Sequence, residues 1–345
     1  MGTEANVGLI SIDDPRDKRV WLGDDGRAYK AQLNPVTNKE HVVPVMVQND
    51  TALLRKDEWI ALDTAVMEAF QTRKRLVGDL QNRNLIHNVT NGLGTMVFQS
   101  QTRSKLNSAL QGMTGMEVTD NEHFQFGLDS LPMYTIHKEL QIPVRMLHAS
   151  RNKGEALDTS GAAECGIKLS EKAEEILAGT TTPFTFGGGT QYGYTNYPDR
   201  VTVDLTYDWT TADGENILTD LLTMLTASQA QLAFGPFSLY VAQDIGLHLE
   251  EDFKANSDKT IRTRLLGVEN IESVMTADYL PDGTVLLVQM TPNCVRLING
   301  LAPTTVQWET NGGGLIHLRV MMILVPQLRS DFYGNCGIVH GTYTA

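Results

Sequence analysis

The sequence predicts an α+β fold in which an extended two-stranded hairpin leads into a long helix, followed by a region of mixed strands and helices. Apolar and polar residues alternate strictly over residues 134–146, which indicates a half-buried strand. Apolar residues recur at helical spacing over residues 156–177, and Gly179 follows them as a helix-ending residue. A hairpin and an exposed helix of this kind cannot bury their apolar faces within one subunit. We therefore expect neighbouring copies of the chain to cover them.

The composition is typical of a folded soluble protein, with 41% apolar and 20% charged residues among 345. The formal net charge of -13 argues against a protein that reads nucleic-acid sequence, because such proteins use excess positive charge to displace counterions from phosphates. It does not argue against a wall that encloses DNA without adhering to it.

Three cysteines, Cys165, Cys294 and Cys336, are too few and too far apart for a zinc cluster, and we expect free, buried thiols in a reducing compartment. No signal peptide is visible in residues 1–14, and the longest apolar run, residues 320–325, is far shorter than a membrane span of about 20 residues. The chain is therefore expected to be made in a cytosol and to stay soluble.

Residues 1–54 are polar, with glycine, aspartate, asparagine and proline scattered among short apolar pairs, and we expect an extended arm there. A helix of about 25 residues is expected to begin at Asp57, since acidic side chains favour the positive end of the helix dipole. The basic cluster of Arg73, Lys74 and Arg75 near its end is interpreted as a solvated face, or as a partner for carboxylates of a neighbour, in preference to a nucleic-acid contact.

The hairpin is expected to run outward along residues 92–101, which have strand character, and through a polar segment at residues 102–122. The alternating segment 134–146 is expected to be its return strand, with Pro143 at an edge or bulged position because proline donates no ladder hydrogen bond. The apolar face of this strand contains Tyr134, Ile136, Leu140, Ile142, Val144 and Met146, and the polar face contains Thr135, His137, Glu139, Gln141 and Arg145.

Beyond the long helix, the glycine- and aromatic-rich segment 180–199 is expected to be a flexible connection that marks a domain boundary. Residues 201–301 alternate between strands and helices, and residues 304–307 and 315–325 return to strand character. Strands are expected at 201–207, 237–242, 271–276, 285–289 and 295–298, and helices at 214–232, 244–254 and 259–266.

No motif nominates a catalytic, cofactor-binding or metal-binding residue, so the chain is interpreted as a structural protein without a cofactor and not as an enzyme. The triglycines at residues 187–189 and 312–314 lack the Lys-Ser/Thr of a phosphate-binding loop and are interpreted as turns. The eight histidines show no metal-binding spacing, and the acidic triplet 250–252 is interpreted as a solvated surface. The alternative from the enzyme class is a soluble α/β enzyme whose site the sequence does not reveal.

The arm, hairpin and helix, in this order, resemble the major capsid proteins of tailed bacteriophages, with the Hong Kong 97 type fold, and the related encapsulin shell proteins. Residues 54–63 (LRKDEWIALD) are similar to the encapsulin N-terminal helix, and residues 126–132 (FGLDSLP) to the descending limb of the E-loop. Residues 162–179 are similar to the spine helix with its terminal glycine, and residues 193–198 (GYTNYP) to the segment that leads into the A-domain. Each motif is short, and their order and spacing carry the resemblance.

The resemblance implies an N-terminal arm (1–54), an N-terminal helix region (55–92), an E-loop (93–148), a P-domain with the spine helix (149–200), an A-domain (201–301) and P-domain C-terminal strands (302–345). It also implies self-assembly into hexamers and pentamers that close into an icosahedral phage head around double-stranded DNA, without sequence-specific contact. The virion is the implied location, after assembly in the host bacterial cytoplasm. The implied partners are separate scaffolding and portal proteins, with cement proteins in some phages, and no membrane.

Some phages of this type join a lysine of the E-loop to an asparagine of the next subunit. Lys105 and Lys138 are available lysines, but no pattern identifies the asparagine or the acid, so no catalytic residue is nominated. The alternative function is an encapsulin-type compartment that encloses a cargo enzyme. The long polar arm ahead of the first helix favours the virus, because simple encapsulins begin that helix close to the N-terminus.

Overall fold

The structure is a computed structural model that describes residues 9–10, 20–22, 28–33, 40–44, 56–72, 74–104, 106, 113, 123–153, 159–254, 258–310 and 314–343. The chain divides into two compact units. The first contains residues 1–60, 141–157 and 307–317, and the second contains residues 61–140, 158–306 and 318–345. None of the described helices is long and apolar enough to span a bilayer.

The first unit contains a small antiparallel sheet where the sequence predicts only an extended arm. Its strands, in spatial order, are β1 (Leu9–Ile10), β2 (Val20–Leu22), β3 (Ala28–Leu33) and β4 (Glu40–Pro44). In this part of the chain the prediction is corrected, because the short apolar runs satisfy their backbone hydrogen bonds by pairing with one another along the chain.

The first unit also contains α3 (Val144–Lys153), which begins where the sequence predicts the end of a strand. The alternating strand ends at Pro143, and the Val144 N–H donates to the Gly314 carbonyl at 3.2 Å. Leu147 is buried whereas Met146 is exposed, so residues beyond 143 follow helical and not strand periodicity. The apolar and polar alternation is nevertheless confirmed from Tyr134 to Ile142.

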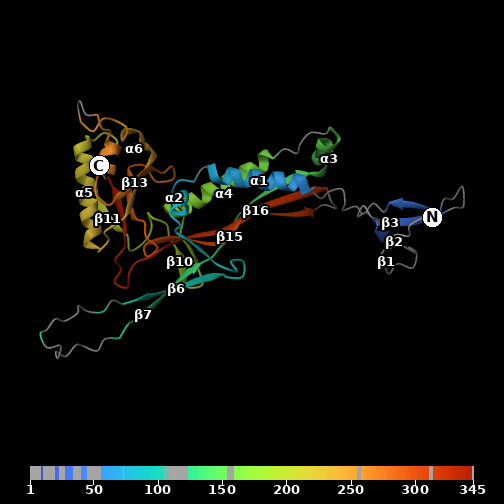
Figure 1. Cartoon of the computed structure of the whole chain (residues 1–345), viewed down its shortest axis with the longest axis horizontal. Helices are drawn as coiled ribbons and strands as arrows, with labels where there is room; N and C mark the ends of the chain where they lie inside the picture. The colour runs from blue at the N-terminus through green and yellow to red at the C-terminus, as the bar shows by residue number, and fades with distance from the viewer. Residues whose placement is uncertain are drawn as a thin grey trace. The chain divides into compact units, whose positions relative to one another are not determined.

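The second unit contains the helices α2 (Leu76–Asn82) and α4 (Ser160–Ala178) and most of α1 (Lys56–Thr72) (Figure 1). The expected 25-residue helix is therefore divided into α1 and α2. The long helix is confirmed, with Gly179 at its end in the left-handed conformation (φ 90°). The apolar residues that recur at helical spacing along it are buried: Ala162, Cys165, Leu169, Ala173, Ile176 and Leu177.

A four-stranded sheet has the order β5 (Ile86–Asn88), β15 (Val295–Thr310), β16 (Leu315–Leu328) and β8 (Ile136–Pro143). The alternating strand of the sequence is β8, at the edge of this sheet. Arg319 of β16 forms an ion pair with Glu139 of β8, which ties the edge strand to its neighbour. The expected strand at 295–298 is the first part of β15, which continues through the segment expected at 304–307.

A five-stranded mixed sheet has the order β11 (Val201–Asp204), β17 (Ile338–Thr342), β14 (Thr284–Gln289), β12 (Phe237–Val241) and β13 (Ile271–Thr276). Helices α5 (Gly214–Ala230), α6 (Gln243–His248) and α7 (Ile261–Leu266) accompany it, and α6 is shorter than the helix expected at 244–254. The core beneath α5 is apolar and includes Trp209, Ile217, Leu221, Met224, Phe237, Leu239, Val285 and Leu287.

Strand β17 was not expected from the sequence, and it belongs to the sheet of residues 201–301. It pairs in parallel with β11 and antiparallel with β14. The assignment of all of residues 302–345 to strands outside that region is therefore wrong for residues 338–342. Five residues carry too little periodicity to indicate their partner, and sheet pairing is decided by contacts distant in sequence.

Candidate assembly interface

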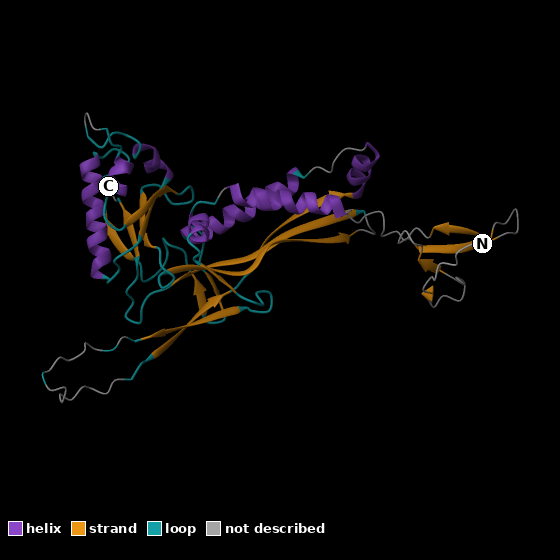
Figure 2. Cartoon of the chain, viewed as in Figure 1, coloured by secondary structure: helices purple, strands orange, loops and turns teal. Residues whose placement is uncertain are grey.

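A two-stranded hairpin projects from the second unit, and its strands are β6 (Val97–Arg103) and β7 (Phe126–Pro132) (Figure 2). They pair antiparallel from Val97 opposite Pro132 to Arg103 opposite Phe126. The expectation that residues 134–146 return the hairpin is wrong, because β8 pairs with β16. Alternation identifies a half-buried strand but not its partner, and β7 itself alternates poorly because Gly127, Asp129 and Ser130 interrupt it.

The hairpin exposes apolar side chains in one short stretch, which we call the hairpin apolar surface: Phe124, Phe126 and Leu128. Phe126 is 68% exposed and Leu128 is 59% exposed. The cross-strand partners of Phe126 and Leu128, Arg103 and Gln101, are polar. The Arg103 guanidinium lies over the Phe124 ring, 5.7 Å from its centroid, whereas Phe126 and Leu128 stay mostly exposed. Neighbouring exposed apolar residues of this size mark a surface that a partner covers.

The base of the hairpin is fixed to the four-stranded sheet. Gln327 of β16 donates its amide to the Ser100 hydroxyl at 2.9 Å and accepts from the Arg296 guanidinium at 2.6 Å. The Arg296 guanidinium also lies over the Phe98 ring, 5.7 Å from its centroid. Below these contacts is a small apolar core of Leu131, Met133, Ile298, Ile323 and Val325. The hairpin therefore has an anchored base and an outer part in which Phe126 and Leu128 are mostly exposed.

A second hairpin, β9 (Phe184–Phe186) and β10 (Gly189–Gln191), lies against β7. The first triglycine forms its turn, as the sequence predicts, with Gly187 and Gly188 at positive φ. Gly189 lies so close to β7 that an added Cβ would come within 2.0 Å of the Ser130 carbonyl oxygen. The segment 180–199, expected to be a flexible connection, thus contains an ordered brace for the β6–β7 hairpin.

A buried polar network connects α2 to α4 and to the five-stranded sheet. The Glu174 carboxylate of α4 accepts the backbone N–H groups of Arg75, Leu76 and Val77 at 2.9–3.0 Å. Burial raises the pKa of Glu174 to about 7, although these three hydrogen bonds favour the charged form. From the other side of α2, the Asp79 carboxylate accepts the Tyr240 hydroxyl at 2.6 Å.

The same network explains the division of the predicted helix. The N-terminus of α2 has no side-chain cap of its own, and the carboxylate from α4 supplies the missing acceptor. Asp79 also accepts from the Ser238 hydroxyl at 3.1 Å and from the Arg83 guanidinium at 2.9 Å. Helical spacing predicts Glu174 on the polar side of the long helix, and this prediction is wrong because the side chain is buried. Asp79 was also missed, since the burial of a carboxylate is visible only in the folded chain.

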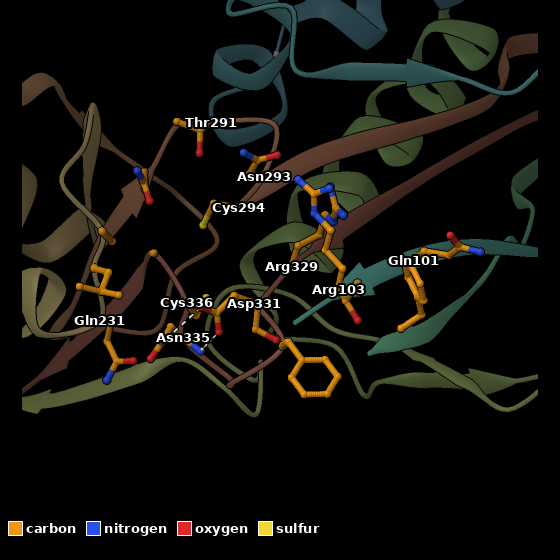
Figure 3. A pocket seen from close by; sticks show the side chains of 18 residues that line it. Gln101, Arg103, Gln231, Thr291, Asn293, Cys294, Arg329, Asp331, Asn335 and Cys336 are labelled. Atoms are coloured by element: carbon orange, nitrogen blue, oxygen red, sulfur yellow. Dashed lines mark hydrogen bonds between the residues drawn. The ribbon is translucent and has the colours of Figure 1, made fainter. Parts of the chain in front are cut away.

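A cavity of about 700 Å³ lies beside the hairpin (Figure 3). Its walls come from both strands of the hairpin, from the loop ahead of β15 and from the loop between β16 and β17. Arg103 and Arg329 contribute positive charge, and Asp331, which accepts from the Asn335 amide at 2.9 Å, contributes negative charge. Cys294 and Cys336 also line it.

The fold does not bring together the other residues that the sequence analysis considered as functional candidates. Lys138 lies exposed on β8, whereas Lys105 and Arg73 lie outside the described residues. Lys74 is partly buried with its ammonium 4.0 Å from the Phe70 ring centroid. Arg75 is exposed. Glu250, Glu251 and Asp252 are exposed, and Gly312 and Gly313 are not described. The described part of the chain contains no cluster of three or more metal-ligating side chains.

A sequence model described as a family of unknown function, DUF6260, matches residues 49–341. No curated protein sequence matches the chain. Among solved structures, the chain is similar to a virus-like particle from Pyrococcus furiosus, with a TM-score of 0.59, 15% identity and coverage of 83% of this chain and 98% of that one. It is also similar to the capsid of Myoviridae phage XM1 (TM-score 0.57, 12% identity, 76% and 91% coverage). A structure from Mycobacterium phage Bobi is similar as well (TM-score 0.54, 13% identity, 76% and 89% coverage). At these identities the likeness shows a shared fold.

Proposed function

We propose that this chain, which belongs to the DUF6260 family and has the Hong Kong 97-like capsid fold, is a structural major capsid protein that self-assembles into a closed shell. The observation that carries the proposal is the combination of this fold over most of the chain with an anchored hairpin on which Phe126 and Leu128 are mostly exposed. A subunit of a shell needs such a surface, because each copy is held by contacts on several sides.

We propose further that this shell is a phage head built from hexamers and pentamers around double-stranded DNA. The net charge of -13 supports a wall that does not adhere to the phosphate backbone. Scaffolding and portal proteins, and in some phages cement proteins, are the partners this role requires. Assembly in a bacterial cytoplasm followed by release in the virion is the corresponding location.

The proposed domain boundaries are those that the sequence resemblance implies, with two changes. The extended loop is the hairpin that begins at β6 and returns through β7, so β8 belongs to the central four-stranded sheet. The A-domain-like region includes β17 in addition to residues 201–301. Residues 1–54 remain assigned to an N-terminal arm, which contains β1 to β4.

The second candidate function is a compartment that encloses a protein cargo. The observation that favours it is the similarity to the Pyrococcus furiosus virus-like particle, which the chain covers almost completely. Both candidates share a shell and differ in its content. We infer a structural and not an enzymatic role from the capsid fold.

The experiment is sedimentation velocity and electron microscopy of the purified full-length chain, followed by analysis of particles from the native host. Capsomers or closed shells are expected, and a monodisperse monomer at high protein concentration would overturn the shell assignment. Double-stranded DNA protected from nuclease inside host particles supports the phage head. A stoichiometric protein cargo without such DNA would favour the compartment.

A further inference from the structure

Two of the three cysteines, distant in sequence, lie next to each other in the fold. Cys294 precedes β15 and Cys336 precedes β17, and their side chains are 4% and 2% exposed. Each thiol is the largest cause of the shifted pKa of the other. Gly337, the neighbour of Cys336, is so close that an added Cβ would lie 2.9 Å from the Cys294 sulfur. The third cysteine, Cys165, lies on α4 and has no such neighbour among the described cysteines.

Backbone hydrogen bonds fix both cysteine segments in place. The Arg329 N–H donates to the Cys294 carbonyl at 2.8 Å, and the Gln289 N–H donates to the Gly337 carbonyl at 2.8 Å. Both cysteines therefore occupy fixed positions on the wall of one cavity, and side-chain rotation is the movement by which their sulfur atoms can form an S–S bond of about 2 Å.

The surroundings distinguish the two thiols chemically. Cys336 first, and then the Gly337 backbone, lower the pKa of Cys294 despite its burial. The pKa of Cys336 is raised, first by its hydrogen bond to Cys294 and then by burial. A pair in which one thiol ionises more readily than its neighbour is the arrangement that favours attack by one sulfur and resolution by the other.

A small oxidant can reach the pair. Both cysteines line the cavity of about 700 Å³ beside the hairpin (Figure 3), which exceeds the volume of a water molecule, about 30 Å³, many times over. The polar side chains of Asn293, Arg329 and Asn335 line the same cavity and make it accessible to a hydrophilic molecule.

We propose that Cys294 and Cys336 form a reversible disulfide within one chain when the protein meets a peroxide. The Cys294 thiolate attacks one peroxide oxygen, the O–O bond breaks, and the sulfur becomes a sulfenic acid while water leaves with the proton. The Cys336 sulfur then attacks the sulfenic sulfur, the S–O bond breaks, and a second water leaves as the S–S bond forms. Two thiols are oxidised and one peroxide is reduced to two waters. A dithiol reductant reverses the change.

The bond has a structural consequence. It joins the beginning of β15, in the four-stranded sheet, to the segment ahead of β17, in the five-stranded sheet, and it closes a loop that contains β15 and β16. Closing a loop of this length restricts the unfolded chain and raises the unfolding temperature. A protein made in a reducing cytosol would thus gain stability after release into oxidising surroundings.

The test uses the full-length chain, exposed to dilute hydrogen peroxide in native buffer and then alkylated in denaturant. Before oxidation three thiols per chain react with the alkylating reagent. After oxidation one thiol is expected to react, peptide mapping is expected to find residue 294 linked to residue 336 in the same chain, and dithiothreitol is expected to restore three. The oxidised chain is expected to unfold at a higher temperature than the reduced one.

The matched controls are Cys165→Ser and Cys294→Ser, which alter one sulfur each. The Cys165→Ser variant is expected to form the same link, and the Cys294→Ser variant is expected to show no peroxide-induced rise in unfolding temperature. Three alkylated thiols after oxidation, a link that involves Cys165, or Cys294 converted to sulfinic acid without a link would each overturn the proposal. Peptide mapping of the wild-type chain decides the matter even where a variant folds poorly.

Discussion

The carboxylate of Glu174, on the buried side of α4, accepts the backbone N–H of Val77 at the first turn of α2 at 2.9 Å. One helix thus caps another from 97 residues away in sequence. The N-terminal N–H groups of a helix need an acceptor, and α2 offers none of its own. The orientation of α2, and through Asp79 its link to the five-stranded sheet, depends on this carboxylate.

The raised pKa of Glu174 predicts a pH-dependent stability. Its carboxyl titrates near pH 7 in the folded chain against a reference of 4.5, so between these values the folded state binds a proton that the unfolded state does not. The stability that the folded chain gains from protonated Glu174 is fully present below pH 4.5 and is lost as the pH rises through 7. It amounts to at most about 3 kcal/mol. The charged groups that interact with Glu174 are Asp278 and Lys74.

The variant that tests this dependence is Glu174→Gln, measured by denaturant unfolding between pH 5 and 8. We expect its stability to change less with pH than that of the wild type over this range. The control is Glu175→Gln, which changes a more exposed carboxylate paired with Lys172 on the same helix. If Glu174→Gln and Glu175→Gln show the same pH profile, the assignment to the buried carboxyl is wrong.

The hydroxyl of Tyr240 is expected to stabilise the fold and that of Tyr194 is not. The two rings stack with centroids 6.3 Å apart, but only Tyr240 donates to Asp79, whereas the buried Tyr194 hydroxyl has no partner among the described residues. Tyr240→Phe leaves a buried carboxylate with one donor fewer and is expected to cost about 1 to 3 kcal/mol of unfolding free energy. Tyr194→Phe removes an unsatisfied hydroxyl and is expected to be neutral or stabilising. Equal losses for both variants would contradict the network.

The hairpin apolar surface is expected to drive assembly and to contribute little to the stability of the single subunit. Leu128→Asp places a charge where a leucine is 59% exposed, so the unfolding temperature of the subunit should hardly change. The protein concentration needed for shell formation should rise about tenfold or more, which corresponds to about 1.4 kcal/mol lost per contact. Light scattering as a function of concentration measures this. Leu128→Met, which keeps an apolar side chain, should assemble normally.

Normal shells from Leu128→Asp would show that the surface is not an interface. A variant that precipitates as the isolated subunit would instead point to a role of Leu128 in folding. Circular dichroism and the unfolding temperature separate these outcomes.

The close approach of Gly189 to β7 predicts a strong difference between two adjacent glycines. A Cβ at residue 189 would meet the Ser130 carbonyl oxygen at 2.0 Å, so Gly189→Ala should displace the β9–β10 brace and cost more than about 2 kcal/mol. A Cβ at residue 188 meets nothing within 4 Å, and Gly188→Ala should cost only the strain of its positive φ, about 1 kcal/mol. Thermal unfolding of both variants tests the ranking, and a reversed order would contradict the described packing.

Local periodicity determined the elements that the sequence predicted correctly. The apolar spacing of α4 and Gly179 specify that helix and its end, and the same kind of pattern places α5, β12 and β13 to within a few residues. The alternation from Tyr134 to Ile142 correctly indicated a half-buried strand. These features depend on residues a few positions apart, so a single chain segment contains the information.

Only the tertiary structure decided which segments meet. It paired β6 with β7 and gave β8 to the four-stranded sheet, it divided the first long helix where Glu174 captures three N–H groups, and it brought Cys294 beside Cys336. It also placed β17 between β11 and β14. Each outcome depends on the burial of residues far apart in sequence, where packing and hydrogen bonding across the fold outweigh the local pattern.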